Sequence, residues 1–329
     1  MATAALTNTE MRIIPMAQAD LAGLEALFDE QCDEWLRLLR WDYTGPSRLI
    51  RQVARQRELS GFVAVRGGAT IGFSYYVIEA SRCSIGDIYV SRESRGAGAD
   101  RLMAEAILEK LSRLPRMRRI ESQCVGVGNE GSNELFKSHG FEHYERLYMM
   151  ADLARLDRAA SQRESAGDDL RQDFSIRPWR EEDFTQAAQV IHRSYVGKHD
   201  SRINSQYATE EGCAELLTIL TDHVWCGDFL PQVSRVAICS ATRDLVGALI
   251  GSRITGGTGH IGQISVHPDY QGLGLGRRMI YGALSEFRRR GFNRASLAVT
   301  SANAGALHLY ESCGFRTVHT FPVFYRERK

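Results

Sequence analysis

A glycine-rich stretch in the second half of the chain contains the residues whose types and spacing could do chemistry. Gly272, Gly274 and Gly276 alternate directly after a short apolar strand pattern that ends at Pro268. A helical pattern follows at once, with apolar residues at i, i+3 and i+4 spacing from Met279 to Phe287. The first amides of a helix lack internal partners and carry partial positive charge, and glycine lets an anion approach the backbone. The stretch therefore predicts a phosphate cradle at a helix N-terminus.

Two arginines at this helix start leave a second interpretation open. Arg277 and Arg278 fall in the first helical turn, where the helix dipole disfavours cations by about 0.3–1 kcal/mol. A bound polyphosphate would reverse that effect. Glycine turns between a strand and a helix are also common for steric reasons alone, and the arginines would then be solvated. The loop by itself does not decide between a phosphate site and a steric turn.

The composition is that of a soluble globular protein with two domains, since 329 residues exceed the usual size of one hydrophobic core. A formal net charge of +1 gives no reason to expect a nucleic-acid partner. The seven scattered cysteines include no CxxC pair, so we expect neither a disulfide framework nor a metal site. The segment from Met1 to Glu10 has no apolar core of signal-peptide length, and no run approaches a membrane span, so we expect a cytoplasmic protein without a membrane partner.

The elements that would position the glycine loop occur twice along the chain. Each half shows an opening strand, a helix, further strands, a glycine loop, a second helix, another strand and a short helix ending at Gly-Phe. The predicted strands are 11–15, 62–65, 71–77, 83–90, 119–125, 174–178, 236–238, 245–254, 260–266, 295–299 and 316–325. Residues 152–173 lack apolar periodicity and predict a linker. We therefore expect one domain over 1–151 and a second over 174–329.

Two motifs of the chain resemble those of the GNAT acetyltransferase superfamily. Gln271 to Gly276 fits the family's pyrophosphate motif, Arg/Gln-x-x-Gly-x-Gly/Ala. The family's later signature reads here as Asn303, Ala306, Leu309-Tyr310 and Gly314-Phe315. The tandem organisation is similar to that of mycothiol synthase. The resemblance implies an α+β fold of two tandem GNAT domains, each a mixed, mostly antiparallel twisted sheet flanked by helices and splayed at the cofactor-binding strand.

The resemblance also implies acetyl-CoA as the acyl donor, with no metal, and an active site in the second domain. Tyr310 stands at the position of the family's general acid, which protonates the leaving thiolate; otherwise it is a half-buried core aromatic. Asn303 is implied at the cofactor and would equally serve as a helix cap. The other implied cofactor residues are Ile264, Ser265 and Val266 on the strand, and Gln271, Gly272, Leu273, Gly274, Leu275, Gly276 and Arg277 in the loop.

The general base is the least defined part of this site. Many members of the family use a residue on the strand that carries Ile264, and strand alternation would place His260 on the same side as Ile264. His260 is the titratable residue near neutral pH on that strand, so it is our candidate. A surface histidine is the alternative, and Glu311 and the loop from His223 to Asp228 are competitors.

The first half departs from the family at the positions where its chemistry matters. Asp100 matches Gly276 and would set a carboxylate beside a diphosphate, while Phe136 matches Tyr310 and has no proton to give. We therefore expect a degenerate, non-catalytic first domain. The expected acceptor is an amine of a small molecule or peptide. The alternatives are an amino-sugar or thiol-sugar amine and, from another class, a non-catalytic acyl-CoA sensor or interaction module; the oligomeric state stays open.

Overall fold

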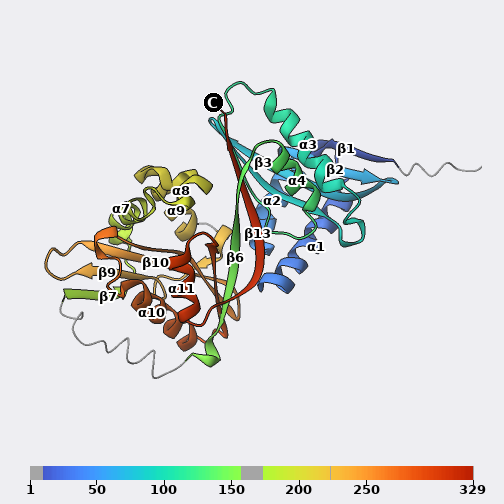
Figure 1. Ribbon diagram of the computed structural model, residues 1–329. Helices are drawn as coiled ribbons and strands as arrows, with labels where there is room; N and C mark the ends of the chain where they lie inside the picture. Colours follow the sequence, from blue (N-terminus) through green and yellow to red (C-terminus); the bar gives the residue numbers. More distant parts are fainter. Residues whose placement is uncertain (1–9, 157–172, 223, 329) are drawn as a thin grey trace, which may run out of the picture. The chain divides into compact units, whose positions relative to one another are not determined.

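The computed structural model describes residues 10–156, 173–222 and 224–328, which form two compact units. The amino-terminal unit comprises Met1–Arg37, Pro46–Glu145 and Phe321–Lys329, and the carboxy-terminal unit comprises Leu38–Gly45 and Arg146–Thr320. Each unit is described by itself (Figure 1). Most of the predicted linker, 157–172, lies outside the described residues. Among the described helices, none combines the length and apolar character needed to cross a membrane.

The amino-terminal unit is a twisted sheet with helices on both faces. Its strands run in the order β1-β2-β3-β4-β5-β13 and are antiparallel except for the pair β4 and β5. Helix α3 packs against one face, where a Cβ added at Gly72 would lie 3.0 Å from Met103. Helix α1 packs against the other, where the rings of Phe28 and Phe73 lie 4.6 Å apart. The elements are β1 (Met11–Pro15), α1 (Leu21–Leu39), α2 (Thr44–Arg55), β2 (Gly61–Arg66), β3 (Ala69–Glu79), β4 (Arg82–Val90), α3 (Ala99–Ser112), β5 (Arg119–Gln123), α4 (Glu130–Ser138) and β13 (Arg316–Glu327).

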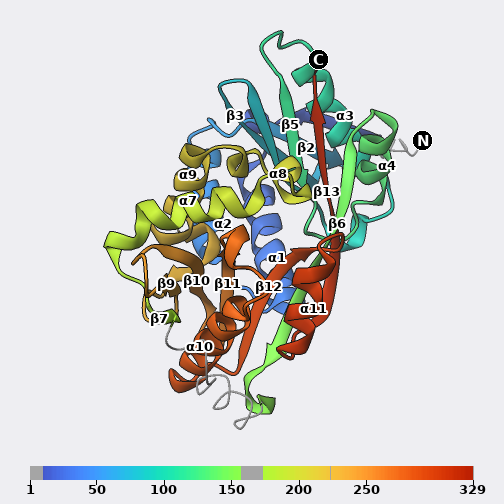
Figure 2. The same cartoon turned by 60° about the vertical axis from the view of Figure 1, so that its left-hand side comes forward.

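The carboxy-terminal unit repeats this plan. Its strands run in the order β6-β12-β11-β10-β9-β7, with β8 paired to β10, and only β11 and β12 are parallel. Helix α10 covers one face of the sheet, and α7 with α9 covers the other (Figure 2). The elements are β6 (Glu142–Asp152), β7 (Phe174–Pro178), α7 (Phe184–Tyr195), α8 (His199–Ile203), α9 (Glu210–Asp222), β8 (Asp228–Phe229), β9 (Arg235–Cys239), β10 (Leu245–Thr255), β11 (Thr258–Val266), α10 (Leu275–Arg289), β12 (Arg294–Thr300) and α11 (Ala304–Ser312).

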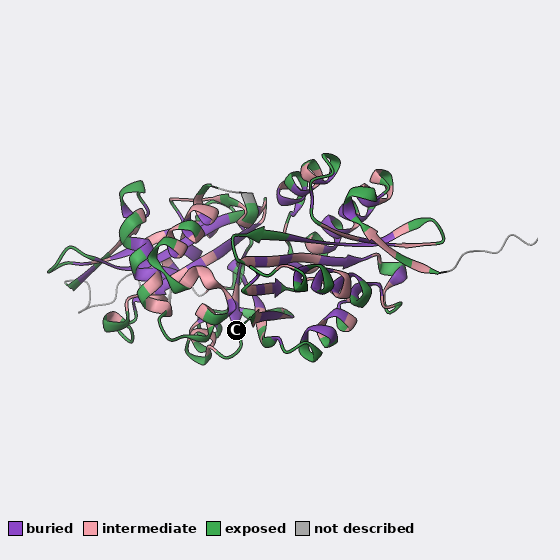
Figure 3. Ribbon diagram, turned by 90° about the horizontal axis from the view of Figure 1, so that it is seen from above, coloured by how far each residue is buried: buried purple, intermediate pink, exposed green. Residues whose placement is uncertain are grey.

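The central strand β10 shows why this sheet is covered on both faces. Its first eight residues are all buried, which is typical of a strand packed on both sides rather than of a half-exposed one. Leu249 contributes to the core under α10, while Ala248 and Ile250 contribute to the core under α7 and α9. Figure 3 shows the same distribution, with buried residues concentrated on the strands and on the inward faces of the helices. The α+β fold expected from the sequence is thereby confirmed.

The two units exchange their last strands, which the sequence-based boundaries at 151 and 174 did not anticipate. Residues 146–152 of β6 pair with β12 in the carboxy-terminal unit, while residues 323–327 of β13 pair with β5 in the amino-terminal unit. Leu38–Gly45, between α1 and α2, also belongs to the carboxy-terminal unit. The difference has a physical reason: strand pairing is long-range, and local apolar periodicity carries no information on which sheet a strand joins.

Strand β11 carries the two irregularities that shape the site. Its parallel ladder with β12 ends at the pair Ile261 and Leu297, although β11 continues to Val266, so the two strands diverge beyond that point. On the other side, Gln263 pairs with Ile250 and Ile261 with Gly251, which leaves Gly262 without a partner in the ladder. This is a β-bulge, and a bulge reverses the inward and outward alternation of the residues that follow it.

Candidate active site

The glycine loop forms an uncapped helix N-terminus. Gly274 is the N-cap residue of α10, with a left-handed φ of 76° and no side-chain capping hydrogen bond. Gly272 also has a positive φ, 80°, and a Cβ added at either glycine would meet no atom within 4 Å. The space beside both glycines is therefore open. Gln271 ties the loop to β11, because its Nε2 donates to the carbonyl of Val266 at 2.9 Å.

This loop borders a cavity of about 990 Å³. Every cofactor residue expected from the sequence lines it except Leu273, whose side chain is exposed. The cavity also carries basic side chains suited to phosphates, and its lining residues are Ser194, Tyr195, Gly197, Lys198, His199, Asp200, Ile264, Ser265, Val266, Tyr270, Gln271, Gly272, Gly274, Leu275, Gly276, Arg277, Ala302, Asn303, Ala304, Gly305, Ala306, His308, Leu309 and Tyr310. Bare amides, open glycines and basic walls fit a nucleotide diphosphate such as that of coenzyme A.

A second, smaller cavity of about 60 Å³ lies where β11 and β12 diverge. We call it the inner cavity; it is lined by Arg146, Tyr195, Asp200, Ile203, Asn204, Tyr207, Ile261, Gly262, Gln263, Ile264, Leu297, Ala298, Val299, Asn303 and Tyr310. Tyr195, Asp200, Ile264, Asn303 and Tyr310 line both cavities, so the two share a wall. The extended arm of a ligand that enters from the large cavity along the splayed strands would thus end among these polar groups.

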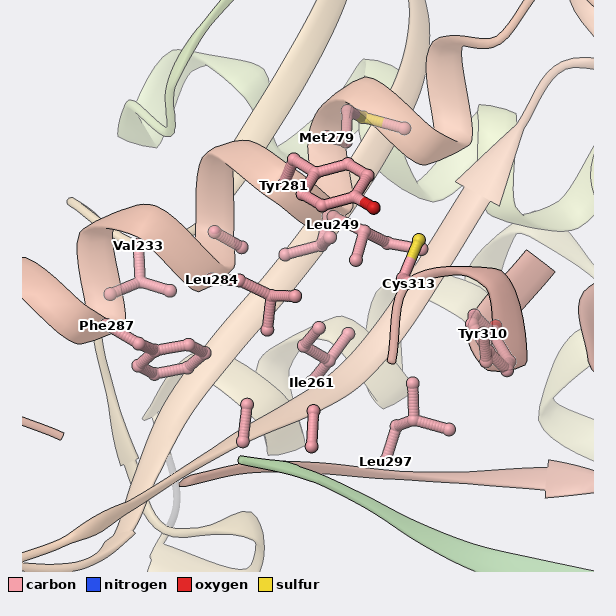
Figure 4. Packing of buried hydrophobic residues seen from close by; sticks show 14 of the residues in the cluster. Val233, Leu249, Ile261, Met279, Tyr281, Leu284, Phe287, Leu297, Tyr310 and Cys313 are labelled. Carbon is pink, nitrogen blue, oxygen red and sulfur yellow. The ribbon is translucent and has the colours of Figure 1, made fainter. Parts of the chain in front are cut away.

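Tyr310 stands at the junction of the two cavities. It lies on α11 at the edge of the apolar core formed with α10, only 8% exposed (Figure 4). Burial raises the pKa of Tyr310 above the usual range of a phenol, and the charges of Tyr195 and Asp200 add to this shift while Arg146 opposes it. The hydroxyl consequently stays protonated throughout the physiological pH range, as a proton donor requires.

Asn303 has both of the roles considered for it from the sequence. Its Oδ1 accepts a hydrogen bond from the amide of Ala306 at 3.2 Å and so caps α11. The same residue lines both cavities. Helix capping therefore fixes the start of the helix that carries Tyr310, and it leaves Asn303 at the cavity wall.

His260 lies outside both cavities, because the bulge at Gly262 breaks the alternation from which its position was inferred. It is 6% exposed and packs against the ring of Trp41 at 4.8 Å, and its Nδ1 lies 3.0 Å from the Oγ of Ser296. Burial and the charge of Arg146 lower the pKa of His260 to about 3. It is a neutral, hydrogen-bonded histidine of the protein interior, and the expected same-side relation with Ile264 is corrected.

The competing candidates for a base are also away from the cavities. Glu311 is exposed on α11 and lines neither one. Asp228 forms an ion pair with Arg253 at 2.6 Å, and His223 lies outside the described residues.

A connected polar network that the sequence did not single out forms one wall of the site. The hydroxyl of Tyr207 donates to the Oε1 of Gln263 at 3.0 Å, and the Nε2 of Gln263 donates to the Oγ of Ser265 at 2.8 Å. Ser194 also donates to that Oγ at 3.0 Å, and the rings of Tyr195 and Tyr207 stack with centroids 3.9 Å apart. The sequence analysis singled out neither of these tyrosines, and it is the tertiary structure that brings them together.

The counterparts of the loop residues in the amino-terminal unit carry side chains that bind to other groups of that unit. Arg95, the counterpart of Gln271, donates to the buried carboxylate of Glu34 at 2.6 and 2.8 Å. Asp100, the counterpart of Gly276, is 4% exposed and accepts a hydrogen bond from the amide of Ser132 at 2.8 Å. Phe136, the counterpart of Tyr310, is fully buried.

Fold and site together define a protein with the GNAT architecture: a parallel strand pair that splays beside an uncapped, glycine-started helix. Two segments of the chain, residues 24–141 and 204–315, match the acetyltransferase (GNAT) family. They cover more than half of the chain, so the protein belongs to this family and carries its domain twice. The tandem GNAT prediction is thereby confirmed.

The chain is similar to two named acetyltransferases and to one solved structure. It is 39% identical over 80 residues to mycothiol acetyltransferase of Thermobispora bispora, which is 23% of this chain and 27% of that protein. It is 46% identical over 52 residues to the [ribosomal protein bS18]-alanine N-acetyltransferase of Escherichia coli K12, which is 16% of this chain and 35% of that protein. The matched segments thus span only about a quarter to a third of these relatives.

The third similarity is to a solved structure and concerns the fold alone. A tandem GNAT protein from the clavulanic acid biosynthesis pathway superposes with a TM-score of 0.57 at 17% identity, over 97% of this chain and 98% of that one. This similarity supports the two-domain architecture.

Proposed function

We propose that the carboxy-terminal unit transfers an acetyl group from acetyl-CoA to an amine of a small molecule or peptide. The observation that carries the proposal is the continuity of the site: the glycine cradle and the splayed end of β11 line one cavity together with Tyr310, which also lines the inner cavity. A catalyst of acyl transfer needs these parts close together. The loop and helix start of this unit, Gln271 to Arg277, would bind the diphosphate through their backbone amides.

Tyr310 acts in this proposal as the general acid. A bound acetyl thioester supplies the acyl group; a bond forms between the amine nitrogen and the acyl carbon as the carbon–sulfur bond breaks. The departing sulfur takes the phenolic proton of Tyr310, and the proton lost by the amine replaces it by way of solvent. Val266 and Ile264 border the large cavity and would contact the pantetheine arm through their backbone.

The proposed acceptor is a class of amines and not a single compound. The relatives described above are named for mycothiol and for an alanine of ribosomal protein bS18, so small-molecule and peptide amines both belong in a test. The amino-terminal unit is proposed to be non-catalytic, because Asp100 replaces the bare Gly276 and Phe136 replaces the phenol of Tyr310.

A thiol-release assay with acetyl-CoA over a panel of amines tests this proposal, after calorimetry has measured acetyl-CoA binding. We expect binding at one site per chain and amine-dependent release of coenzyme A. Tight binding without release on any amine would instead favour a non-catalytic acyl-CoA sensor. No binding at all would overturn both functions.

A further inference from the structure

The inner cavity holds two opposite charges that do not pair with each other. Arg146 on β6 and Asp200 on α8 both line it, next to Tyr310. We propose that the acetyl acceptor is an amine that also carries an acidic group, a carboxylate or a phosphate, and that Arg146 binds this acid while Asp200 binds the amine. The inference rests on the proposed acetyl transfer and specifies its substrate class.

The contacts of Arg146 leave its guanidinium short of partners. Its Nη2 donates to the carbonyl of Ala298 at 3.3 Å, while its Nε is buried and has no hydrogen-bond partner. Within residues 10–156, 173–222 and 224–328, no carboxylate oxygen lies within 4.0 Å of this guanidinium. A half-buried guanidinium without a counter-ion is unfavourable, and its planar fork matches a carboxylate or phosphate in two parallel hydrogen bonds.

Asp200 faces the same space with spare capacity as an acceptor. Its Oδ1 accepts a hydrogen bond from the Oγ1 of Thr300 at 2.6 Å. No described lysine, arginine or histidine forms an ion pair with it. Because an ionised carboxylate accepts about four hydrogen bonds, Asp200 can still receive the N–H groups of an amine.

Thr300 fixes the relation between the two charges. It lies directly opposite Arg146 in the antiparallel ladder of β6 and β12, and it donates to Asp200. Residues directly opposite in such a ladder present their side chains on the same face. Arg146 and Asp200 therefore flank one threonine at the C-terminal end of β12, beyond the last residue of that strand that pairs with β11.

This arrangement discriminates between classes of amine. A diamine would place a second cation beside Arg146, and a neutral amine would leave the guanidinium without a partner. A site built around a buried polar group rejects an analogue that lacks the matching group, because the protein's own group then stays unsatisfied. An amine with an acid satisfies both charges at once.

The test compares matched amines with the full-length chain at saturating acetyl-CoA. Glycine, β-alanine and γ-aminobutyrate are each paired with the corresponding uncharged amide, and O-phosphoethanolamine is paired with ethanolamine. We expect thiol release with a kcat/KM at least about tenfold higher for the acidic member of the best pair, mainly through KM. Comparison of the three carboxylate pairs with the phosphate pair identifies the preferred acid. Equal or better rates for the neutral members would overturn the proposal.

Variants separate acid binding from a general role in catalysis. Arg146→Gln should raise KM at least about tenfold for the acidic amines and leave kcat/KM of the neutral amines unchanged. The KM of Arg146→Lys for the acidic amines should lie between those of the unaltered chain and Arg146→Gln, because lysine keeps the charge and loses the planar fork. Arg294→Gln, an exposed arginine at the other end of β12, is the control and should change neither class.

The remaining outcomes are also decisive. An equal loss of kcat/KM for acidic and neutral amines in Arg146→Gln would show that Arg146 positions Tyr310 and does not bind an acid. That result would overturn the proposal. Acetyl-CoA binding without transfer to any acidic amine would overturn it while leaving the cofactor site intact. Loss of acetyl-CoA binding in the unaltered chain would instead remove the proposed function itself.

Discussion

The carboxylate of Asp100 caps a helix that is not its own: its Oδ2 accepts from the amide of Ser132, 2.8 Å away, in the first turn of α4. In the other unit the equivalent helix is capped by Asn303, and the residue equivalent to Asp100 is Gly276. In the amino-terminal unit Asn129, the counterpart of Asn303, makes no capping hydrogen bond through its side chain. Asp100 has thus taken over a structural role at the place where the other unit leaves room for a phosphate.

Replacing this carboxylate should therefore affect stability and not activity. Asp100→Ala should destabilise α4 by about 0.5–2 kcal/mol, the usual cost of losing an N-terminal cap. Hydrogen exchange of the α4 amides measures this, and Asp100→Asn, which keeps a side-chain acceptor oxygen, should exchange more slowly than Asp100→Ala. Acetyl-CoA stoichiometry and turnover should stay at the values of the unaltered chain. A loss of turnover in Asp100→Asn would show that the amino-terminal unit takes part in catalysis.

Tyr310→Phe should separate binding from proton transfer. The change removes one hydroxyl at the junction of the two cavities and little volume, so the Kd for acetyl-CoA should stay the same. Turnover should fall by about 10²-fold, as is typical when a general acid is lost. Thiol release that is slower by about 10²-fold, with an unchanged Kd by calorimetry, is the expected pair of results. Turnover like that of the unaltered chain would make Tyr310 a packing residue.

The pH dependence of turnover tests the same residue independently. Because burial raises the pKa of Tyr310, the phenol should stay protonated as the pH rises through its ordinary value near 10. The alkaline limb of kcat should therefore not fall at that pH on account of this residue. A decline centred near pH 10 that disappears in Tyr310→Phe would show a solvated phenol instead.

His260 should affect stability at acidic pH rather than the reaction. Its pKa in the folded protein is lowered to about 3, below the ordinary value of 6.5, so the unfolded chain binds the proton more readily. The contribution of neutral His260 to the free energy of unfolding is fully present above pH 6.5 and is lost as the pH falls toward 3. Urea unfolding at several pH values should show this loss, and His260→Gln should weaken the dependence while retaining acetyl transfer. If His260→Gln abolished transfer at pH 7.5 in a folded protein, the catalytic role inferred from the sequence would be reinstated.

The sequence predicted the parts of the site that are local in the chain. Gly272, Gly274 and the first turn of α10 follow one another directly, so spacing alone was enough to predict an open helix N-terminus. Tyr310 was assigned from the resemblance of a motif that is also local in the chain, from Asn303 to Phe315. His260 was misplaced because one extra residue, Gly262, reverses the alternation of β11, and no composition rule reveals a bulge at that glycine.

Arg146 shows a different limit of sequence reasoning. It lies within the first 151 residues, which the repeat assigned to the amino-terminal domain, yet its strand segment completes the sheet of the carboxy-terminal unit. The segment that carries Asp200 and Tyr207 showed no strong periodicity, because α8 spans only His199–Ile203. Both inner-cavity charges are thus supplied by long-range strand pairing and a short helix, and neither leaves a pattern in the sequence.

The last prediction uses the repeat as a matched control for the glycine cradle. Gly274 and Gly98 are the N-cap residues of α10 and α3, with left-handed φ values of 76° and 81° and no side-chain capping bond. A Cβ at either position would meet no atom within 4 Å, so an aspartate is strained equally in both, by about 1 kcal/mol. Only Gly274 borders the large cavity, and there an aspartate would set a carboxylate beside the diphosphate.

Gly274→Asp should therefore weaken acetyl-CoA binding by roughly tenfold or more, because a like charge about 4 Å away costs about 1–4 kcal/mol. Gly98→Asp should lower the thermal stability as much as Gly274→Asp does, and it should leave the Kd for acetyl-CoA unchanged. Calorimetry measures the Kd for acetyl-CoA of both variants, and thermal melts compare the backbone strain that each aspartate causes. Equal losses of affinity would mean that both units bind acetyl-CoA, and a loss confined to Gly98→Asp would assign the cofactor to the amino-terminal unit.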